Sequence, residues 1–326
     1  AVNPYDMQEH KFSKSQPENV VFLKRVRKLL DEFPGTTTVG EVGDSHVGLK
    51  LMGEYTSGGD KLHMAYTFDM LGNEFTAEHF RSKMKRFFDS NPDGWPCWSF
   101  SNHDVDRHVS RWSRHALDRT TLAKQAAGMI IALKGSICIY QGEELGLPQA
   151  DILFEELTDP PGIRFWPEYK GRDGERTPMP WDEGEAPNGF STAKPWLPVK
   201  PEHSALSVAA QNADPDSVLN FYRAALAFRR AHPALIGGDI EFFKVNEPLL
   251  AFRRRNADES LVCVYNLSAG TLKFAFDGDA ELLLGQDAER LKGKLTLGAN
   301  GWGIFNESGD NPLHIEFKRR AKKPSN

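Results

Sequence analysis

Acidic side chains follow short apolar segments of this chain, at the positions where strands would end. Glu41 follows the β-branched run at 36–40, and His103 and Asp104 follow the apolar run at 95–100. In proteins built from repeated βα units, functional groups project from the carboxyl ends of the parallel strands. We therefore expect Glu41 and Asp104 to face each other across one pocket.

Two carboxyl groups in one pocket suit acid–base chemistry on a sugar. Their mutual repulsion raises the pKa of one group, which then holds a proton near neutral pH. In glycoside hydrolysis one carboxylic acid protonates the departing oxygen, while nearby negative charge stabilises an oxocarbenium-like transition state. His103 would hydrogen-bond the sugar hydroxyls. The alternative for a lone acid is a solvated loop residue, and Glu143 and Glu144 equally fit acids in the first turn of a helix.

Alternating helical and strand-like segments are the elements that would hold these groups. Apolar residues recur with a helical period near 22–33, 76–88, 118–134 and 216–232. Short β-branched or apolar runs predict strands at 36–40, 63–68, 95–100 and 137–140. Residues 43–62 are rich in glycine and predict a loop. This alternation favours the α/β class, with a parallel sheet covered by helices.

The period of the hydrophobic pattern changes at about residue 236, which predicts a domain boundary. Residues 1–236 contain the βα segments and a long connection at about 146–214, rich in Pro, Gly and acidic residues, which is typical of a site-building loop. Residues 237–318 carry short alternating segments between turn signals, which predict an antiparallel β-sandwich. Residues 319–326 form a basic tail that we expect to be solvated.

Composition narrows the class of protein. The chain has 326 residues, with 40 Lys and Arg against 45 Asp and Glu, and its net charge of −5 gives no electrostatic reason to bind nucleic acid or an anionic membrane. No apolar run approaches the ~18–20 residues of a spanning helix. The dispersed Cys97, Cys138 and Cys263 predict free thiols rather than a disulfide scaffold. We expect a cytoplasmic protein that binds neither nucleic acid nor membrane.

Four motifs carry a resemblance to a known family. They are Gly-Glu-Val-Gly-Asp at 40–44, Ser-Asn-His-Asp-Val-Asp-Arg at 101–107, Tyr-Gln-Gly-Glu-Glu-Leu-Gly at 140–146, and Gly-Arg-Asp-Gly-Glu-Arg-Thr-Pro-Met-Pro-Trp at 171–181. In this order they resemble the α-glucosidase and oligo-1,6-glucosidase branch of the α-amylase family, glycoside hydrolase family 13. The C-terminal strands fit the β-sandwich domain of that family less distinctively.

The resemblance implies a role for each of five residues. Glu41 would be the general acid/base on the fifth strand of a (β/α)8 TIM barrel, and Asp104, on the seventh strand, would stabilise the transition state. His103 would bind the sugar in the −1 subsite. Arg172 would grip the non-reducing-end glucose, and Phe68 would form a wall near the site.

Two further arginines have weaker assignments. Arg107 and Arg111 are candidates for the mouth of the site, where surface ion pairing explains them equally well.

The nucleophile of this family, an aspartate in a Gly-Phe-Arg-x-Asp motif on the fourth strand, has no counterpart here. The chain also starts without an initiator Met or a signal-peptide pattern. We therefore expect the C-terminal half of the barrel, strands 5–8, followed by the sandwich. No cofactor and no metal ion are expected in this part, and a structural calcium or magnesium ion would belong to the absent half. A half-barrel has open edges, so it needs that half or a second copy to close the sheet.

These expectations lead to a functional prediction in two parts. The parent protein is predicted to be an exo-acting α-glucosidase that releases terminal glucose from short α-linked oligosaccharides or aryl α-glucosides with retention of configuration. The isolated chain is predicted to be inactive, because the two-step retaining route needs the nucleophile. The alternatives are a non-catalytic amylase-like accessory protein, and a sucrose isomerase or transglucosylase.

Overall fold

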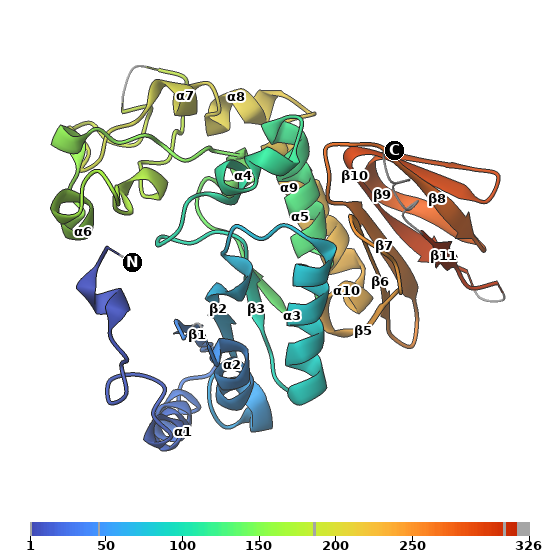
Figure 1. Ribbon diagram of the computed structural model, residues 1–326, viewed down its shortest axis with the longest axis horizontal. Helices are drawn as coiled ribbons and strands as arrows, with labels where there is room; N and C mark the ends of the chain where they lie inside the picture. The colour runs from blue at the N-terminus through green and yellow to red at the C-terminus, as the bar shows by residue number, and fades with distance from the viewer. Residues whose placement is uncertain (1, 45, 185–186, 309–310, 318–326) are drawn as a thin grey trace, which may run out of the picture. The chain divides into compact units, whose positions relative to one another are not determined.

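The computed structural model describes residues 2–44, 46–184, 187–308 and 311–317. The chain forms two compact units, each assembled from separate stretches of sequence (Figure 1). The first unit consists of Ala1–Gly72, Arg86–Arg111 and Ser136–Ala224, and the second of Asn73–Lys85, Trp112–Gly135 and Ala225–Asn326. The predicted basic tail, 319–326, lies outside the described residues.

Four short parallel strands run through the first unit. They are β1 (Val39–Val42), β2 (Met64–Thr67), β3 (Cys97–Ser99) and β4 (Ser136–Cys138). β1 pairs with β2 and β3 pairs with β4, and a parallel bridge from Ala65 to Pro96 joins the two pairs. The four predicted strands and their parallel direction are confirmed, although their boundaries shift by a few residues. The shift matters at β1, which extends through Glu41 instead of ending before it.

The helices of the described chain differ widely in length. Their bounds are α1 (Glu18–Leu30), α2 (Gly48–Thr56), α3 (Ala77–Ser90), α4 (His108–Arg111), α5 (Arg119–Ile130), α6 (Pro160–Arg164), α7 (Pro201–Ser204), α8 (Val208–Ala213), α9 (Val218–Ala231) and α10 (Pro233–Gly237). The four predicted helices correspond to α1, α3, α5 and α9. Among these helices of the described residues, none has the length and apolar character that a membrane-spanning helix requires.

The prediction of a loop at 43–62 is wrong, because α2 occupies its centre. Leu49 and Met52 are buried, and their spacing of three residues is that of one helix face. Gly53, which suggested a loop, is needed for close packing: a Cβ there would come within 2.0 Å of the Asn91 side chain. This glycine therefore marks a close approach of two segments and not a turn.

The long connection predicted at 146–214 is folded into short elements. It contains α6, drawn in green at the left of Figure 1, and α7 and α8, drawn in yellow near its top. Ala150, Ile152 and Leu157 form a small buried cluster, against which the partly buried Trp166 packs. The segment thus has an apolar core of its own, which holds the side chains that it contributes to the site.

The second unit contains an antiparallel sheet. Its strands are β5 (Asp239–Phe242), β6 (Leu249–Arg255), β7 (Ser260–Asn266), β8 (Leu272–Asp277), β9 (Ala280–Leu291), β10 (Lys294–Glu307) and β11 (His314–Glu316). Their order is β11-β8-β10-β7-β6-β5, and β9 also pairs with β10. The expected sandwich would have two separate sheets, whereas these hydrogen bonds join all the strands into one. The long β10 pairs with β8 through its first part and with β7 through its second, and residues of all three strands pack in one apolar cluster.

Two buried arginines close the carboxyl end of α5 within the second unit. Arg229 donates to the backbone oxygens of Leu133 and Leu235 at 3.0 and 2.9 Å, and also to those of Ile131 and Gly135. Arg254, which is 0% exposed, donates to the oxygens of Ala132, Leu235 and Gly238 at 2.5 to 2.9 Å. Carbonyl groups after the last helical turn have no partner within the helix, and these guanidinium groups supply one.

Candidate active site

Glu41 is positioned by the pairing of β1 with β2. It lies opposite Tyr66 in the parallel register, and the Tyr66 hydroxyl donates to Glu41 Oε1 at 2.5 Å. Asn102, just beyond β3, points its Nδ2 at the same oxygen from 3.5 Å. Burial, together with the hydrogen bond to Glu41, raises the pKa of Tyr66, so this hydroxyl stays protonated and remains a donor. The carboxyl group of Glu41 is therefore held in one orientation by two neighbouring strands.

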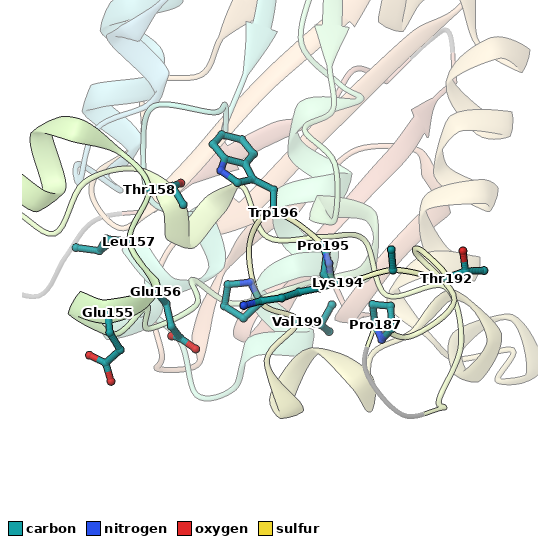
Figure 2. A pocket seen from close by; sticks show the side chains of 12 residues that line it. Glu155, Glu156, Leu157, Thr158, Pro187, Thr192, Lys194, Pro195, Trp196 and Val199 are labelled. Atoms are coloured by element: carbon teal, nitrogen blue, oxygen red, sulfur yellow. The ribbon is translucent and has the colours of Figure 1, made fainter.

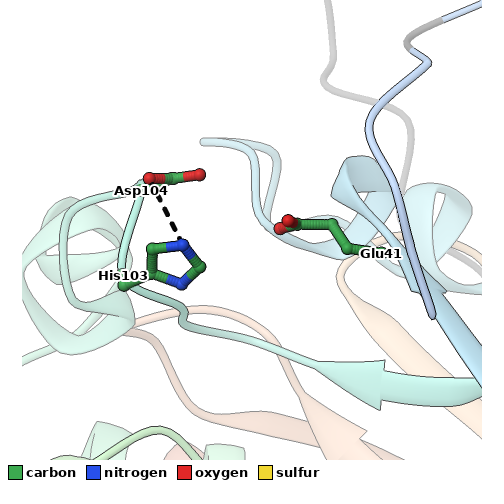
Figure 3. A group of neighbouring side chains, drawn as sticks. All are labelled: Glu41, His103 and Asp104. Carbon is green, nitrogen blue, oxygen red and sulfur yellow. Dashed lines mark ion pairs between the residues drawn. The ribbon is translucent and has the colours of Figure 1, made fainter. Parts of the chain in front are cut away.

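His103 and Asp104 lie on the loop that follows β3. Asn102 Oδ1 accepts the backbone N–H of Asp104 at 2.9 Å, which fixes the turn. His103 Nε2 lies 3.7 Å from Asp104 Oδ1. One polar atom each of Glu41, His103 and Asp104 lies within 4.8 Å of the other two, and Figure 3 shows the Glu41 side chain extending toward the other two. The structure thus brings these three predicted residues together in what we call the Glu41–Asp104 cluster.

Two arginines from the 171–181 motif bind the carboxylate of Asp104. Arg172 Nη1 and Arg176 Nη2 each donate to Asp104 Oδ1 at 2.9 Å. Arg176 Nε also donates to the backbone oxygen of His103 at 2.7 Å. Sequence reasoning found Arg172 and missed Arg176, although the second arginine stands only four residues later in the same motif.

Asp159 holds Arg172 from the other side. Its two carboxylate oxygens accept Arg172 Nε at 3.1 Å and Nη2 at 2.9 Å, and Oδ2 also accepts the Arg172 backbone N–H at 2.9 Å. Burial alone would raise the pKa of Asp159, but these hydrogen bonds and the charge of Arg172 hold the pKa below its ordinary value. The hydrogen bonds and charge of Asp159 in turn raise the pKa of Arg172. A fork-to-fork pair of this kind fixes the guanidinium plane, so Arg172 meets Asp104 in a fixed direction.

Phe68 lies beside the cluster. It begins the short 3-10 turn Phe68–Met70 directly after β2. A Cβ on Gly43, two residues beyond Glu41, would lie 3.3 Å from its ring. The half-buried ring therefore packs against the loop that follows Glu41.

Arg107 and Arg111, the two weaker candidates for the mouth of the site, donate hydrogen bonds to backbone oxygens. Arg107 is only 2% exposed and donates to the backbone oxygens of Gln141 and Glu175 at 2.5 and 2.9 Å. Arg111 donates to those of Gly72 and Phe100 at 2.9 and 2.5 Å. Arg107 is buried, so its assignment to the mouth of the site is wrong. The contacts given above do not join either arginine to the Glu41–Asp104 cluster.

Glu143 lies in the first turn of a short 3-10 helix, as the sequence allowed, and it is buried. It begins the 3-10 turn Glu143–Leu145 and accepts the hydroxyl of Tyr222 at 3.1 Å. Burial raises the pKa of Glu143 to about 8 and that of Glu175 to about 7. Both carboxyl groups therefore retain a proton at a pH where exposed acids are ionised.

The spacing of the cluster would also fit a metal ion, but its charges oppose one. Asp104 Oδ1 is already shared by two guanidinium groups, whose positive charge repels a cation at that oxygen. Glu41 Oε1 is occupied by the Tyr66 hydroxyl. The donor set thus fits a neutral polyhydroxylated ligand better than a cation.

A separate cavity of about 660 Å³ lies on the 146–214 connection (Figure 2). Trp196, Lys194 and Thr158 are among the side chains that line it, and none of the predicted site residues does. Its wall includes Leu157 and Thr158, directly before Asp159 in the sequence. The cavity therefore shares a chain segment with the arginine-binding carboxylate but no residue with the Glu41–Asp104 cluster.

Comparisons with known proteins identify the family. The family model "Alpha amylase, catalytic domain" matches residues 2–238. A probable α-glucosidase of Rhizobium meliloti (strain 1021) is 51% identical over 269 residues, which are 82% of this chain and 49% of that protein. An oligo-1,6-glucosidase of Heyndrickxia coagulans is 35% identical over 59% of this chain and 38% of its own length.

Comparison with solved structures identifies the same family. The crystal structure of an α-glucosyl transfer enzyme, XgtA, matches with a TM-score of 0.87 and 42% identity, over 94% of this chain and 57% of that one. The chain spans about half the length of the curated relatives it matches. This chain belongs to the α-amylase family, in the branch of the α-glucosidases and oligo-1,6-glucosidases.

Proposed function

We propose that the complete protein is a retaining α-glucosidase that hydrolyses terminal non-reducing glucose from short α-linked oligosaccharides. The observation that carries this proposal is the Glu41–Asp104 cluster, in which one polar atom of each member lies within 4.8 Å of the others. A pyranose ring entering this site would meet one carboxyl group held by a tyrosine and another held by two arginines. Two carboxyl groups in different environments are what acid-assisted glycoside cleavage requires.

Each residue has a role that follows from its partners. Glu41 donates its proton to the glycosidic oxygen and later removes a proton from the attacking water. Asp104 accepts hydrogen bonds from Arg172 and Arg176, and its carboxylate stabilises the oxocarbenium-like transition state. His103 hydrogen-bonds the sugar in the −1 subsite. The resemblance implies that Arg172 grips the terminal glucose, while Phe68 shields the site.

The nucleophile must come from outside this chain. We infer that residues 1–236 form strands 5–8 of a (β/α)8 barrel, that 237–318 form the C-terminal β-domain, and that an N-terminal half-barrel or a second copy closes the sheet. The support lies on the first elements of the chain: α1 buries none of its residues, and Val21, Phe22, Leu29 and Val39 are all more than half exposed. An apolar helix and strand surface of this kind favours a protein partner. We expect no cofactor in this chain.

The test compares the chain alone with the chain joined to, or produced with, the N-terminal half of the full gene product. We expect glucose release from p-nitrophenyl α-glucoside and maltose only when both halves are present, with the α-anomer of glucose formed first. Glucose release by the 326-residue chain alone, at confirmed intact mass, would refute the need for a second half. An inactive but sugar-binding complete protein would instead favour the non-catalytic accessory protein.

Transglucosylation is a second candidate function. The 42% identity to a protein described as an α-glucosyl transfer enzyme favours it, and the two reactions share the acid and the stabilising carboxylate. Product analysis separates them: glucose alone from maltose, or equal amounts of glucose and fructose from sucrose, indicates hydrolysis. Longer oligosaccharides indicate transfer, and a rearranged disaccharide from sucrose indicates isomerisation.

A further inference from the structure

Arg107 joins three loops, of which one carries Asp104 and another carries the arginines that bind it. It stands three residues after Asp104, on the loop that follows β3. Its Nη1 donates to the backbone oxygen of Gln141, on the loop that follows β4, at 2.5 Å, and its Nη2 donates to that of Glu175 at 2.9 Å. Its backbone N–H donates to Gln149 Oε1 at 3.1 Å, and Gln149 Nε2 donates to Glu175 Oε2 at 2.6 Å.

Together with the backbone, these contacts close a ring that includes Asp104. Glu175 precedes Arg176, and Arg176 returns to the loop of Asp104 through Asp104 Oδ1 at 2.9 Å and His103 O at 2.7 Å. The Glu175 oxygen also accepts the Tyr140 hydroxyl at 3.0 Å, which holds this point of the ring more firmly. Moving Arg107 would therefore move both the loop of Asp104 and the loop of the arginine that binds it.

Arg107 is buried at an energetic cost. Its side chain is 2% exposed and donates to carbonyl groups, and burial lowers its pKa. Its Nε is buried without a hydrogen-bond partner among the described residues. A buried guanidinium that has only partial satisfaction is expensive. Gly142 also has to be glycine beside it, since a Cβ would lie 2.7 Å from Nη1 and the residue has a φ of +80°.

We propose that Arg107 is a positioning residue for Asp104: it ties the Asp104 loop to the Arg172–Arg176 segment and so fixes the direction in which this carboxylate meets the sugar. It acts without touching the substrate, because its guanidinium group is enclosed by the three loops. The proposal rests on the proposed function for its catalytic consequence, but its structural part concerns the described chain alone.

The structural part is tested by hydrogen–deuterium exchange on the 326-residue chain. In Arg107→Met we expect exchange to rise about 10-fold or more in both 102–107 and 172–177, while 249–266 stays within about twofold. Arg254→Met is the matched control, since it removes another buried arginine bonded to carbonyl groups, within the second unit. It should leave 102–107 and 172–177 unchanged. Unchanged exchange at 172–177 in Arg107→Met overturns the proposal.

The catalytic part is tested in the complete protein. A small misplacement of a catalytic group costs on the order of 10²-fold in rate, so we expect kcat to fall about 10²-fold in Arg107→Met, with KM within about threefold. Arg107→Lys should recover only part of this loss, because one ammonium group cannot bond both carbonyl groups in the fork geometry. An equal loss of kcat in folded Arg254→Met overturns the positioning role.

The proposed function and the positioning role of Arg107 can fail independently of each other. If the complete wild-type protein releases no glucose, the proposed function fails, and the exchange experiment still decides the role of Arg107. If Arg107→Met does not fold, Gly142→Ala replaces it, because the added methyl group displaces Nη1 without removing the guanidinium. The same exchange in 102–107 and 172–177 is then measured, and protection equal to that of the wild type refutes the proposal.

Discussion

Two pairs of arginines, one in each unit of this protein, form hydrogen bonds with different kinds of acceptor. In the first unit, Arg172 and Arg176 donate to the carboxylate of Asp104. In the second, Arg229 and Arg254 donate to backbone carbonyl groups beyond α5. Hydrogen bonding to carboxylates, first of all to Asp159, raises the pKa of Arg172, whereas burial lowers the pKa of Arg254 to about 9.

This difference in hydrogen-bond partners distinguishes a binding site from a contact that only stabilises the fold. The carboxylate-bound arginines are partly exposed, so their charge is balanced while their edges remain open to a polar ligand. The carbonyl-bound arginines are enclosed, and they satisfy groups that a helix end would otherwise leave without a partner. In these two pairs, identical side chains thus hold a carboxylate of the candidate site in one case and close a helix end in the other.

The largest effect should come from removing the charge that the site arginines share. In the complete protein, Asp104→Asn should lower kcat/KM by about 10³-fold, because electrostatic stabilisation of the transition state is lost. The measurement is steady-state kinetics with p-nitrophenyl α-glucoside. Asp106→Asn, two residues away and exposed, is the control and should stay within about twofold. If Asp104→Asn keeps more than a tenth of the wild-type kcat/KM, the contrast between the two arginine pairs is contradicted.

Substitution of Arg254, the counterpart in the second unit, should change the stability of the chain and not its activity. Arg254→Met leaves several carbonyl groups without a donor, so we expect the free energy of unfolding to fall by about 3 kcal/mol. Urea unfolding of the chain measures it. Arg255→Met, at the neighbouring exposed position on β6, should change the free energy by less than about 0.5 kcal/mol. Equal effects of the two substitutions would contradict the structural role of Arg254.

A buried acid that accepts a tyrosine hydroxyl sharpens the comparison. Glu143 keeps its proton in the folded chain up to about pH 8, whereas an unfolded glutamic acid loses it near pH 4.3. Stability should therefore decrease as the pH rises between these values. We expect Glu143→Gln to remove about 2 kcal/mol of this decrease between pH 5 and pH 8.

Unfolding experiments at a series of pH values provide the measurement for Glu143→Gln. The exposed Glu183→Gln is the control and should leave the pH dependence as in the wild type. A Glu143→Gln profile that still falls as steeply as the wild type would mean that Glu143 is ionised in the folded chain.

The smallest expected effect concerns the carboxylate behind Arg172. The pKa of Asp159 is lowered in the folded chain, so its stabilising contribution is present above the unfolded value of about 3.9 and is lost as the pH falls through the folded value. Asp159→Asn should cost about 1 kcal/mol at pH 7 and almost nothing well below pH 3. Asp151→Asn, whose carboxylate is 75% exposed, serves as the control in the same unfolding measurements. A cost that is independent of pH would rule out the ionic contribution.

Some parts of the site follow from periodicity, and others do not. Parallel strands end at one edge of a sheet, which is why the positions of Glu41 and Asp104 after apolar runs predicted their proximity. The helix α2 was missed, because glycines that permit close packing have the same appearance in a sequence as glycines of a loop. Arg107 was assigned to the surface, since one sequence gives no measure of the burial of an arginine. Arg176 was missed for a related reason: its partner stands 72 residues earlier.

The amino-acid sequence by itself determined the α/β pattern of the first part, the alternating strands of the second, and the family, because local periodicity and short motifs are properties of neighbouring residues. Only the tertiary structure decided which charged groups meet. Pairing depends on contacts between segments far apart in the chain, and burial changes the free energy of a charge by more than any local preference does. The division of the arginines into a recognising pair and a structural pair is of this second kind.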